Sequence, residues 1–171
     1  VKDADGKTLV EGQDYDLIYP DEMKIPGKYN IEVFFKGNYL GGKDLTFTIA
    51  PKATTGVKAK TQTTSSITLT WTKTTGATGY RVYQYSPSKG KYVVKASVKD
   101  VTTYKVSGLK AGTTYKFKIK PYVKSDDGTV IWGSASSALS TATKPSTPTV
   151  KSVTASSGKA TLIWNNVSGE S

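Results

Sequence analysis

Apolar and polar residues alternate along many short segments of the chain. In residues 66–72, for example, Ile67, Leu69 and Trp71 alternate with polar residues, and a period of two residues places neighbouring side chains on opposite faces of a β-strand. Turns that contain Gly and Ser separate these segments, and no long apolar pattern of helical period interrupts them. The pattern predicts an all-β protein in which each strand buries one face.

Seven short strands are expected in residues 53–144. They cover residues 57–61, 66–72, 80–85, 91–97, 103–106 and 114–122, and the last one lies within 133–143. Alternating strands of this length bury their apolar positions best in two packed sheets with Greek-key connections. The fold predicted for this segment is therefore a complete β-sandwich.

The first 51 residues contain a separate series of strands. An Asp-Gly turn at residues 3–6 suits a hairpin, and further strands are expected at 15–19, 29–35 and 45–49. In the second of these, Tyr29, Ile31, Val33 and Phe35 share one face. The alternation is that of a β-strand.

An internal repeat sets the organisation of the remaining residues. Residues 67–71 return as 160–164, 93 positions later, and the match extends without a gap to residues 57–58 and 150–151. A period of this length is a whole small domain, not a solenoid unit. A short Pro-containing linker is expected at 145–148, followed by the first two strands of a second copy at 149–171.

The second copy holds two strands without the remainder of a domain. Two isolated strands are marginally stable in water, and their open edges can pair with other strands. We therefore expect residues 149–164 to bury their apolar side chains by strand exchange with the first unit of another copy of the chain.

The middle segment resembles a fibronectin type III domain. The resemblance is carried by Trp71, by Gly79-Tyr80-Arg81-Val82-Tyr83 and by Gly108-Leu109-Lys110-Ala111-Gly112-Thr113-Thr114-Tyr115. It implies that Trp71, Tyr80, Leu109 and Tyr115 are buried together. It also implies a tyrosine corner, in which the Tyr115 hydroxyl bonds to the backbone of the preceding turn.

The first segment resembles the C-terminal part of the bacterial immunoglobulin-like repeats of Gram-positive surface proteins. Four short motifs carry this likeness: Gly12-x-Asp14-Tyr15, Pro26-Gly27-x-Tyr29, Gly37-Asn38-Tyr39-x-Gly41 and Phe47-Thr48-Ile49-x-Pro51. Such repeats have further strands before these motifs. The expected architecture is a tandem of immunoglobulin-like and fibronectin type III β-sandwiches, with the first (1–51) and last (149–171) domains incomplete.

Composition argues against catalysis. The chain contains neither cysteine nor histidine, so thiolate nucleophiles, disulfides, imidazole bases and the commonest zinc ligands are missing. Its serines have no histidine to activate them and no nucleophile elbow. We expect no enzyme activity, no cofactor and no metal site, and no apolar run approaches the length of a membrane span.

Charge is concentrated in the middle segment. The net charge is −3 over residues 1–51, +13 over 52–144 and +1 over 145–171. In residues 115–120 three lysines alternate with apolar residues, so they line one face of a strand about 6.6–6.8 Å apart. The fibronectin type III resemblance implies that the strand at 80–85 lies beside this one and adds one Arg and two Tyr, which makes a surface for anionic polymers or glycans. This candidate surface comprises Arg81, Tyr83, Tyr85, Lys116, Lys118 and Lys120. The alternative is a solvated lysine face that only discourages aggregation.

Other candidate sites have simpler interpretations. Asp3-x-Asp5-Gly6 begins like a calcium loop, but the residues after it break that pattern. We therefore expect ordinary turns there and at Asp126-Asp127-Gly128. Trp132 could be a sugar platform, but packing is the favoured interpretation. The chain also lacks Arg-Gly-Asp, so integrin binding by that tripeptide is unsupported.

These observations favour a non-catalytic spacer that presents other domains of a secreted, multidomain bacterial protein at the cell surface or wall. The absence of cysteine fits a Gram-positive exported protein. One alternative is an adhesion module whose partner is an anionic wall polymer, a glycan or another surface protein. The second alternative is an accessory region of a wall hydrolase or glycosidase. Nucleic acid is not an expected partner, because no recognition motif accompanies the positive charge.

Overall fold

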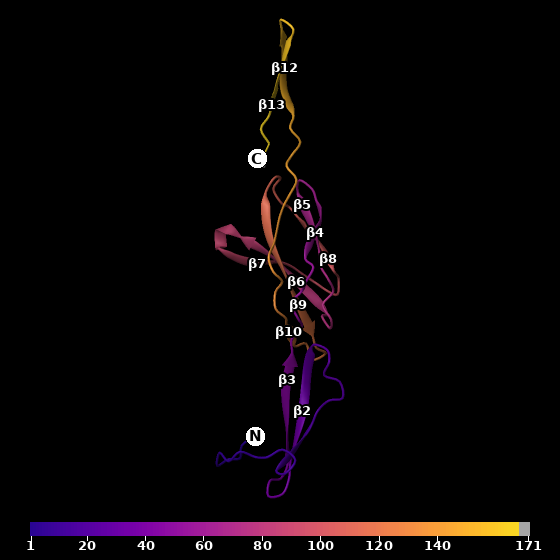
Figure 1. The fold of residues 1–171 in the computed structure, drawn as a ribbon, viewed down its shortest axis with the longest axis vertical. Coiled ribbons are helices and arrows are strands. Elements are labelled where there is room, and N and C mark those ends of the chain that lie inside the picture. The colour runs from indigo at the N-terminus through magenta and orange to yellow at the C-terminus, as the bar shows by residue number, and fades with distance from the viewer. Residues whose placement is uncertain (168–171) are drawn as a thin grey trace.

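The computed structural model describes residues 1–167, and three β-sheet bodies follow one another along its long axis (Figure 1). The first body contains β1 (Tyr15–Ile18), β2 (Gly27–Phe35) and β3 (Gly42–Ile49). The middle body contains β4 (Lys58–Gln62), β5 (Ser66–Thr70), β6 (Gly79–Ser86), β7 (Lys91–Val98), β8 (Thr103–Ser107), β9 (Thr114–Lys124), β10 (Val130–Trp132) and β11 (Leu139–Ala142). The last body contains β12 (Val150–Ser156) and β13 (Lys159–Trp164). A short 3-10 helix, Pro87–Lys89, joins β6 to β7. The all-β prediction is confirmed.

The first body is an antiparallel sheet in the order β1-β2-β3. Along β2 the side chains of Tyr29, Ile31, Val33 and Phe35 are each less exposed than their neighbours, as the alternation predicts. Leu9, Tyr15 and Val33 form a small buried core at the end of this body that is distant from the middle one. The opposite face of the sheet is open.

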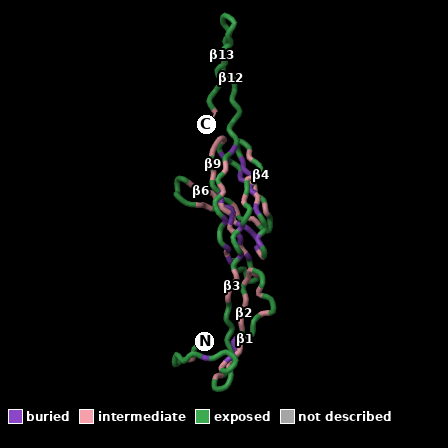
Figure 2. Tube along the Cα trace, in the orientation of Figure 1, coloured by how far each residue is buried: buried purple, intermediate pink, exposed green. Residues whose placement is uncertain are grey.

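The middle body is the predicted sandwich. One sheet has the order β4-β5-β8, and the other has the order β10-β9-β6-β7 with β11 also paired to β9. Inward side chains of both sheets meet in one core, which is the most extensive buried region of the molecule (Figure 2). The core residues are Ile67, Leu69, Trp71, Ala77, Tyr80, Val82, Val106, Leu109, Phe117 and Ile119.

β11 is the strand predicted within 133–143, and β10 is an additional strand that the sequence did not predict. β10 pairs with the C-terminal half of β9 and β11 pairs with its N-terminal half. Between them the chain leaves the ladder at Gly133, where a Cβ would overlap the Pro51 carbonyl oxygen. Ser136 then rejoins β9, since its amide donates to the Ile119 carbonyl (2.8 Å) and its hydroxyl accepts from the Ile119 amide (3.0 Å).

The tyrosine corner is present. The Lys110 amide donates a hydrogen bond of 2.8 Å to the Tyr115 hydroxyl. Trp71, Tyr80 and Leu109 are buried in the core, and the Trp71 and Tyr80 rings meet edge to face at 5.4 Å. Tyr115 packs against that core but is only partly buried, so the expectation of full burial was wrong for this residue. Its hydrogen bond lies near the surface, because the corner is at the end of the sandwich.

The second copy of the repeat forms an isolated antiparallel hairpin of β12 and β13. Its turn has positive φ at Ser157 (49°) and Gly158 (75°), as two-residue hairpin turns require. Nearly all of its side chains are exposed (Figure 2). Strand exchange with another copy therefore stays a prediction, which light scattering at increasing concentration can test. The last four residues of the predicted 149–171 unit lie outside the described residues.

Candidate functional site

The larger sheet of the sandwich brings the predicted surface residues together. β6 and β9 pair so that Arg81 lies opposite Lys120 and Tyr83 lies opposite Lys118. Phe117 and Ile119, which alternate with the lysines along β9, are fully buried. The alternation of a strand then places the partly exposed residues on the outer side of the sheet. We call this side the basic face.

Aromatic rings lie under the cations of the basic face. The Arg81 Cζ is 4.2 Å from the centroid of the Trp132 ring, and the Lys120 Nζ is 5.6 Å from the same ring. The Lys118 Nζ is 4.8 Å from the Tyr92 ring. These distances are within the range of cation–π attraction, which extends to about 6 Å. Trp132 therefore packs, as predicted, but on the outer face and against two cations.

The N-terminal half of β9 continues the same arrangement. The Lys116 Nζ is 6.0 Å from the centroid of the Tyr85 ring, and the Tyr85 and Tyr92 rings meet edge to face at 5.4 Å. Tyr92 and Trp132 are the members of the face that the sequence prediction missed. The signal for Tyr92 was its place in an alternating strand next to 80–85, which puts it opposite Tyr85.

The strands that form the basic face, all within residues 1–167, carry no carboxylate that could balance its cations. β6, β7, β9, β10 and β11 contain neither Asp nor Glu. Residues 52–144 hold three aspartates, and two of them pair with lysines elsewhere: Asp100 with Lys73 at 2.6 Å and Asp127 with Lys28 at 2.9 Å. The charge of the basic face is therefore open to solvent and to anions.

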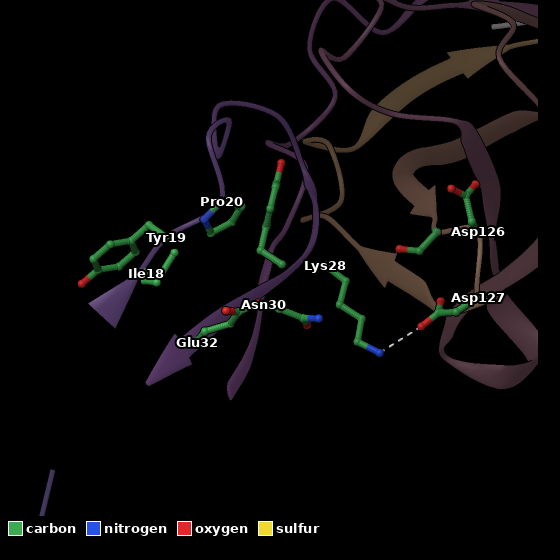
Figure 3. A pocket seen from close by; sticks show the side chains of 10 residues that line it. Ile18, Tyr19, Pro20, Lys28, Asn30, Glu32, Asp126 and Asp127 are labelled. Carbon is green, nitrogen blue, oxygen red and sulfur yellow. Dashed lines mark hydrogen bonds and ion pairs between the residues drawn. The ribbon is translucent and has the colours of Figure 1, made fainter. Parts of the chain in front are cut away.

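A second candidate site lies at the junction of the first body and the sandwich. Figure 3 shows the Lys28 side chain of β2 pointing at Asp127, which lies in the turn between β9 and β10. Asp127 also accepts a hydrogen bond of 2.9 Å from the Thr129 amide. The hydrogen bond from Lys28, followed by those from Thr129, lowers the pKa of Asp127 to about 2. The turn at 126–128 is as predicted, and the ion pair is an addition to it.

Steric contacts also fix this junction. Gly76 has a φ of +71°, and a Cβ at this position would overlap the Cδ of Pro26. Gly133 is similarly close to the carbonyl oxygen of Pro51. A shallow cleft of about 540 Å³ lies beside the Lys28–Asp127 ion pair, with Tyr19, Glu32 and Asp126 among the residues that line it. Glycine is needed at both positions because a side chain would overlap the Pro26 ring or the Pro51 carbonyl oxygen.

The remaining candidate site, the possible calcium loop at residues 3–6, is an ordinary turn. Asp3 Oδ1 accepts hydrogen bonds from the amides of Asp5 (3.1 Å) and Lys7 (2.9 Å), which makes the predicted plain turn. Among residues 1–167, no group of three His, Cys, Asp or Glu side chains is placed to hold a metal ion. No helix in that range has the length and apolar character needed to cross a membrane.

Parts of two bacterial chitinases are similar in sequence to this chain. Chitinase A1 of Niallia circulans is 39% identical over 106 residues, which are 60% of this chain and 14% of that protein. Chitinase D of the same organism is 38% identical over 96 residues, or 54% of this chain and 17% of that protein. The chain thus spans less than a fifth of the curated relatives that it matches.

Two of the solved structures that resemble this chain each cover just over half of it. "Structure of FN3tt mut" is 26% identical and covers 56% of this chain and 99% of its own, with a TM-score of 0.44. The FN5 domain of Drosophila Lar is 24% identical and covers 56% and 98%, with a TM-score of 0.42. The model of the fibronectin type III domain matches residues 50–138, which are just over half of the sequence. Because that match coincides with the sandwich and its tyrosine corner, the chain belongs to the fibronectin type III family.

Proposed function

We propose that these residues form a non-catalytic spacer in a secreted, multidomain bacterial protein, where they hold a carbohydrate-degrading domain at a defined distance and angle from its neighbours. The similarity to parts of two bacterial chitinases supports the carbohydrate context. The lack of histidine and cysteine supports a non-catalytic role. An extracellular location at the cell surface or wall belongs to the same proposal.

The observation that carries this proposal is the close junction between the first body and the sandwich. A linker that only tethers two domains is exposed and makes few contacts across the boundary. Here Pro26 of the first body lies against Gly76, and Lys28 pairs with Asp127. Pro51, in the connection that follows β3, lies against Gly133 and holds this connection on the sandwich. Together these contacts restrain the angle between the two bodies.

The steric contacts carry more of this restraint than the ion pair does. Lys28 and Asp127 are exposed by 37% and 46%, and solvent screens a pair of this kind. The Pro26 ring, in contrast, occupies the space that any side chain at residue 76 would need. We therefore expect the ion pair to narrow the range of angles at a junction that the prolines already define.

Distance measurements between spin labels test the spacer role. The chain has no cysteine, so Lys43→Cys on β3 and Lys95→Cys on β7 give two unique and exposed labelling sites. We expect one narrow distance distribution. Replacing the ion pair by Lys28→Ser with Asp127→Asn should broaden it slightly, and Gly76→Val should shift or broaden it strongly.

A matched control separates the junction from general loss of charge. Lys36 and Asp16 form another exposed ion pair, within the first body and away from the junction. Lys36→Ser with Asp16→Asn removes the same charges and should leave the distance distribution unchanged. A broad distribution in the unaltered protein would contradict the proposal, because a flexible joint cannot hold a neighbouring domain at a fixed angle.

A functional test uses a full-length protein that contains this region and a glycoside hydrolase domain. Deleting the region should leave hydrolysis of a short soluble oligosaccharide unchanged, because no catalytic group is removed. Hydrolysis of the insoluble polymer should slow, because the catalytic domain loses its spacing. Equal loss of both activities would instead show that the region acts directly on catalysis.

A further inference from the structure

We infer that the basic face binds a linear acidic polysaccharide, and that it does so through its cations and not through its aromatic rings. This binding function goes beyond the spacer role and does not depend on it. The cations concerned are Arg81, Lys116, Lys118 and Lys120, which lie on the two paired strands at the centre of the larger sheet.

The cations of this face are available to an anion. A ring attracts a cation through its quadrupole but carries no net charge, so cation–π contact leaves the positive charge uncompensated. The strands of this sheet contain no carboxylate that could neutralise it. Arg81 donates its Nε–H to the Ser97 hydroxyl at 3.3 Å, a neutral partner that also leaves the charge in place.

The rings of this face are less available than its charges. Arg81 and Lys120 both lie over Trp132, and Lys118 lies over Tyr92. A neutral sugar or a nucleobase that binds by stacking needs a free ring face, so it would have to displace these cations. The geometry therefore favours a ligand whose own negative charges contact the cations where they are.

The arrangement of the cations fits a polymer better than a small anion. Lys116, Lys118 and Lys120 follow one another along β9 at alternate positions, which are about 6.6–6.8 Å apart. They form a row along one strand and do not converge on one point. A chain with regularly repeated carboxylates can contact several of them at once, so that each contact raises the effective concentration of the next.

The row is also held in place before any ligand binds. The alternate residues Phe117 and Ile119 are fully buried beneath it, so the backbone of β9 is part of the core. The rings under the ammonium groups restrict the lysine side chains in addition. Restricted side chains lose less entropy on binding.

Affinity chromatography and titration with polygalacturonate test the inference. The unaltered chain should bind this carboxylated polysaccharide at low ionic strength and release it as salt rises. Lys116→Ser, Lys118→Ser and Lys120→Ser together should lower the affinity by on the order of tenfold or more, because three of the four cations are removed. Binding that survives this triple change would overturn the assignment of the face.

The opposite sheet offers a control with the same change in charge. Lys58, Lys60 and Lys105 are exposed on β4 and β8. Replacing all three with Ser lowers the net charge equally but leaves the basic face intact, so most of the binding should remain. Equal loss in the two triple variants would show that only the overall positive field matters, and would contradict a specific face. Thermal melting of each variant checks its fold, and Lys→Gln versions replace any Ser variant that unfolds.

Trp132 gives a direct readout at the site. In a Trp164→Phe background the remaining tryptophans are Trp132 and the buried Trp71. A carboxylate that contacts Arg81 and Lys120 where they lie over the indole changes the electric field at the ring, and this should change the Trp132 emission. We expect this change with polygalacturonate and not with a neutral glucan. No change at saturating polygalacturonate, or single-stranded DNA that binds as tightly as the polysaccharide, would contradict the inference.

Discussion

Leu69 in β5 and Leu162 in β13 occupy the same position of the repeat, yet their surroundings differ completely. Leu69 is 0% exposed and Leu162 is 51% exposed, and the tryptophans that follow them are 4% and 57% exposed. Both strands pair with the strand before them in an antiparallel ladder that contains one shift of register. The local hairpin is therefore similar in the two copies, and burial is not a property of the hairpin.

The difference lies in the partners of the strand. β5 also pairs with β8, and its inward side chains meet β6 and β9 of the opposite sheet. β13 pairs with β12 alone. A repeated apolar pattern thus predicts which face of a strand can be buried. Whether that face is buried depends on packing against strands that are distant in the sequence.

The largest expected difference is between two leucine truncations. Leu69→Ala removes a side chain from a closed core and should lower the free energy of unfolding of the sandwich by about 2–5 kcal/mol. Leu162→Ala removes a half-exposed side chain and should change it by less than about 0.5 kcal/mol. Urea unfolding of the two variants measures both. Similar losses would mean that β13 shares a core with the sandwich.

A smaller loss of stability is expected from a contact between β6 and the loop that follows β5. The Tyr80 hydroxyl accepts a buried hydrogen bond of 2.8 Å from the Thr74 amide, beside the Trp71 ring. Tyr80→Phe should cost about 1–3 kcal/mol, because it leaves a buried amide without a partner. A variant as stable as the parent in thermal melting would show that water or another group replaces this bond.

The tyrosine corner should contribute less than Tyr80. The hydrogen bond from the Lys110 amide to the Tyr115 hydroxyl is near the surface, where water can satisfy the amide when the hydroxyl is absent. Tyr115→Phe should therefore cost about 0.5–1.5 kcal/mol. Urea unfolding in parallel with Tyr80→Phe ranks the two bonds, and a larger loss at Tyr115 would reverse the assignment.

The smallest change in stability is expected from the Lys28–Asp127 ion pair at the junction, and this change depends on pH. The folded-state pKa of Asp127 is lowered from 3.8 to about 2. The Lys28–Asp127 pair therefore contributes stability above pH 3.8, and this contribution is lost as the pH falls through about 2. Asp127→Asn should flatten this part of the stability curve. An unchanged curve would mean that the pair does not couple to folding.

The sequence predicted those features that depend on local pattern. The strand at 29–35, the sandwich core around Leu69 and the hydrogen bond of Tyr115 all followed from alternation or from motif spacing. The paired rows of β6 and β9 followed as well, because the family resemblance places these strands side by side.

Features that depend on tertiary contacts were not predictable. β10 is only three residues long, which is too short for a period of two to be recognised. The Lys28–Asp127 pair joins residues 99 positions apart. The cover of Trp132 by Arg81 depends on the pairing of β10 with β9 and on side-chain rotamers. The partial exposure of Tyr115 depends on where the corner lies at the end of the sandwich.

Amide hydrogen exchange on the dilute protein tests most directly the claim that the middle sandwich holds its own complete core while the second copy does not. The amides of β5 and β9 should exchange only through global unfolding. Those of β13 should exchange orders of magnitude faster, because local opening of a two-stranded hairpin exposes them. Equal protection of the Leu69 and Leu162 amides under these conditions would contradict the account, because β13 would then have to be covered.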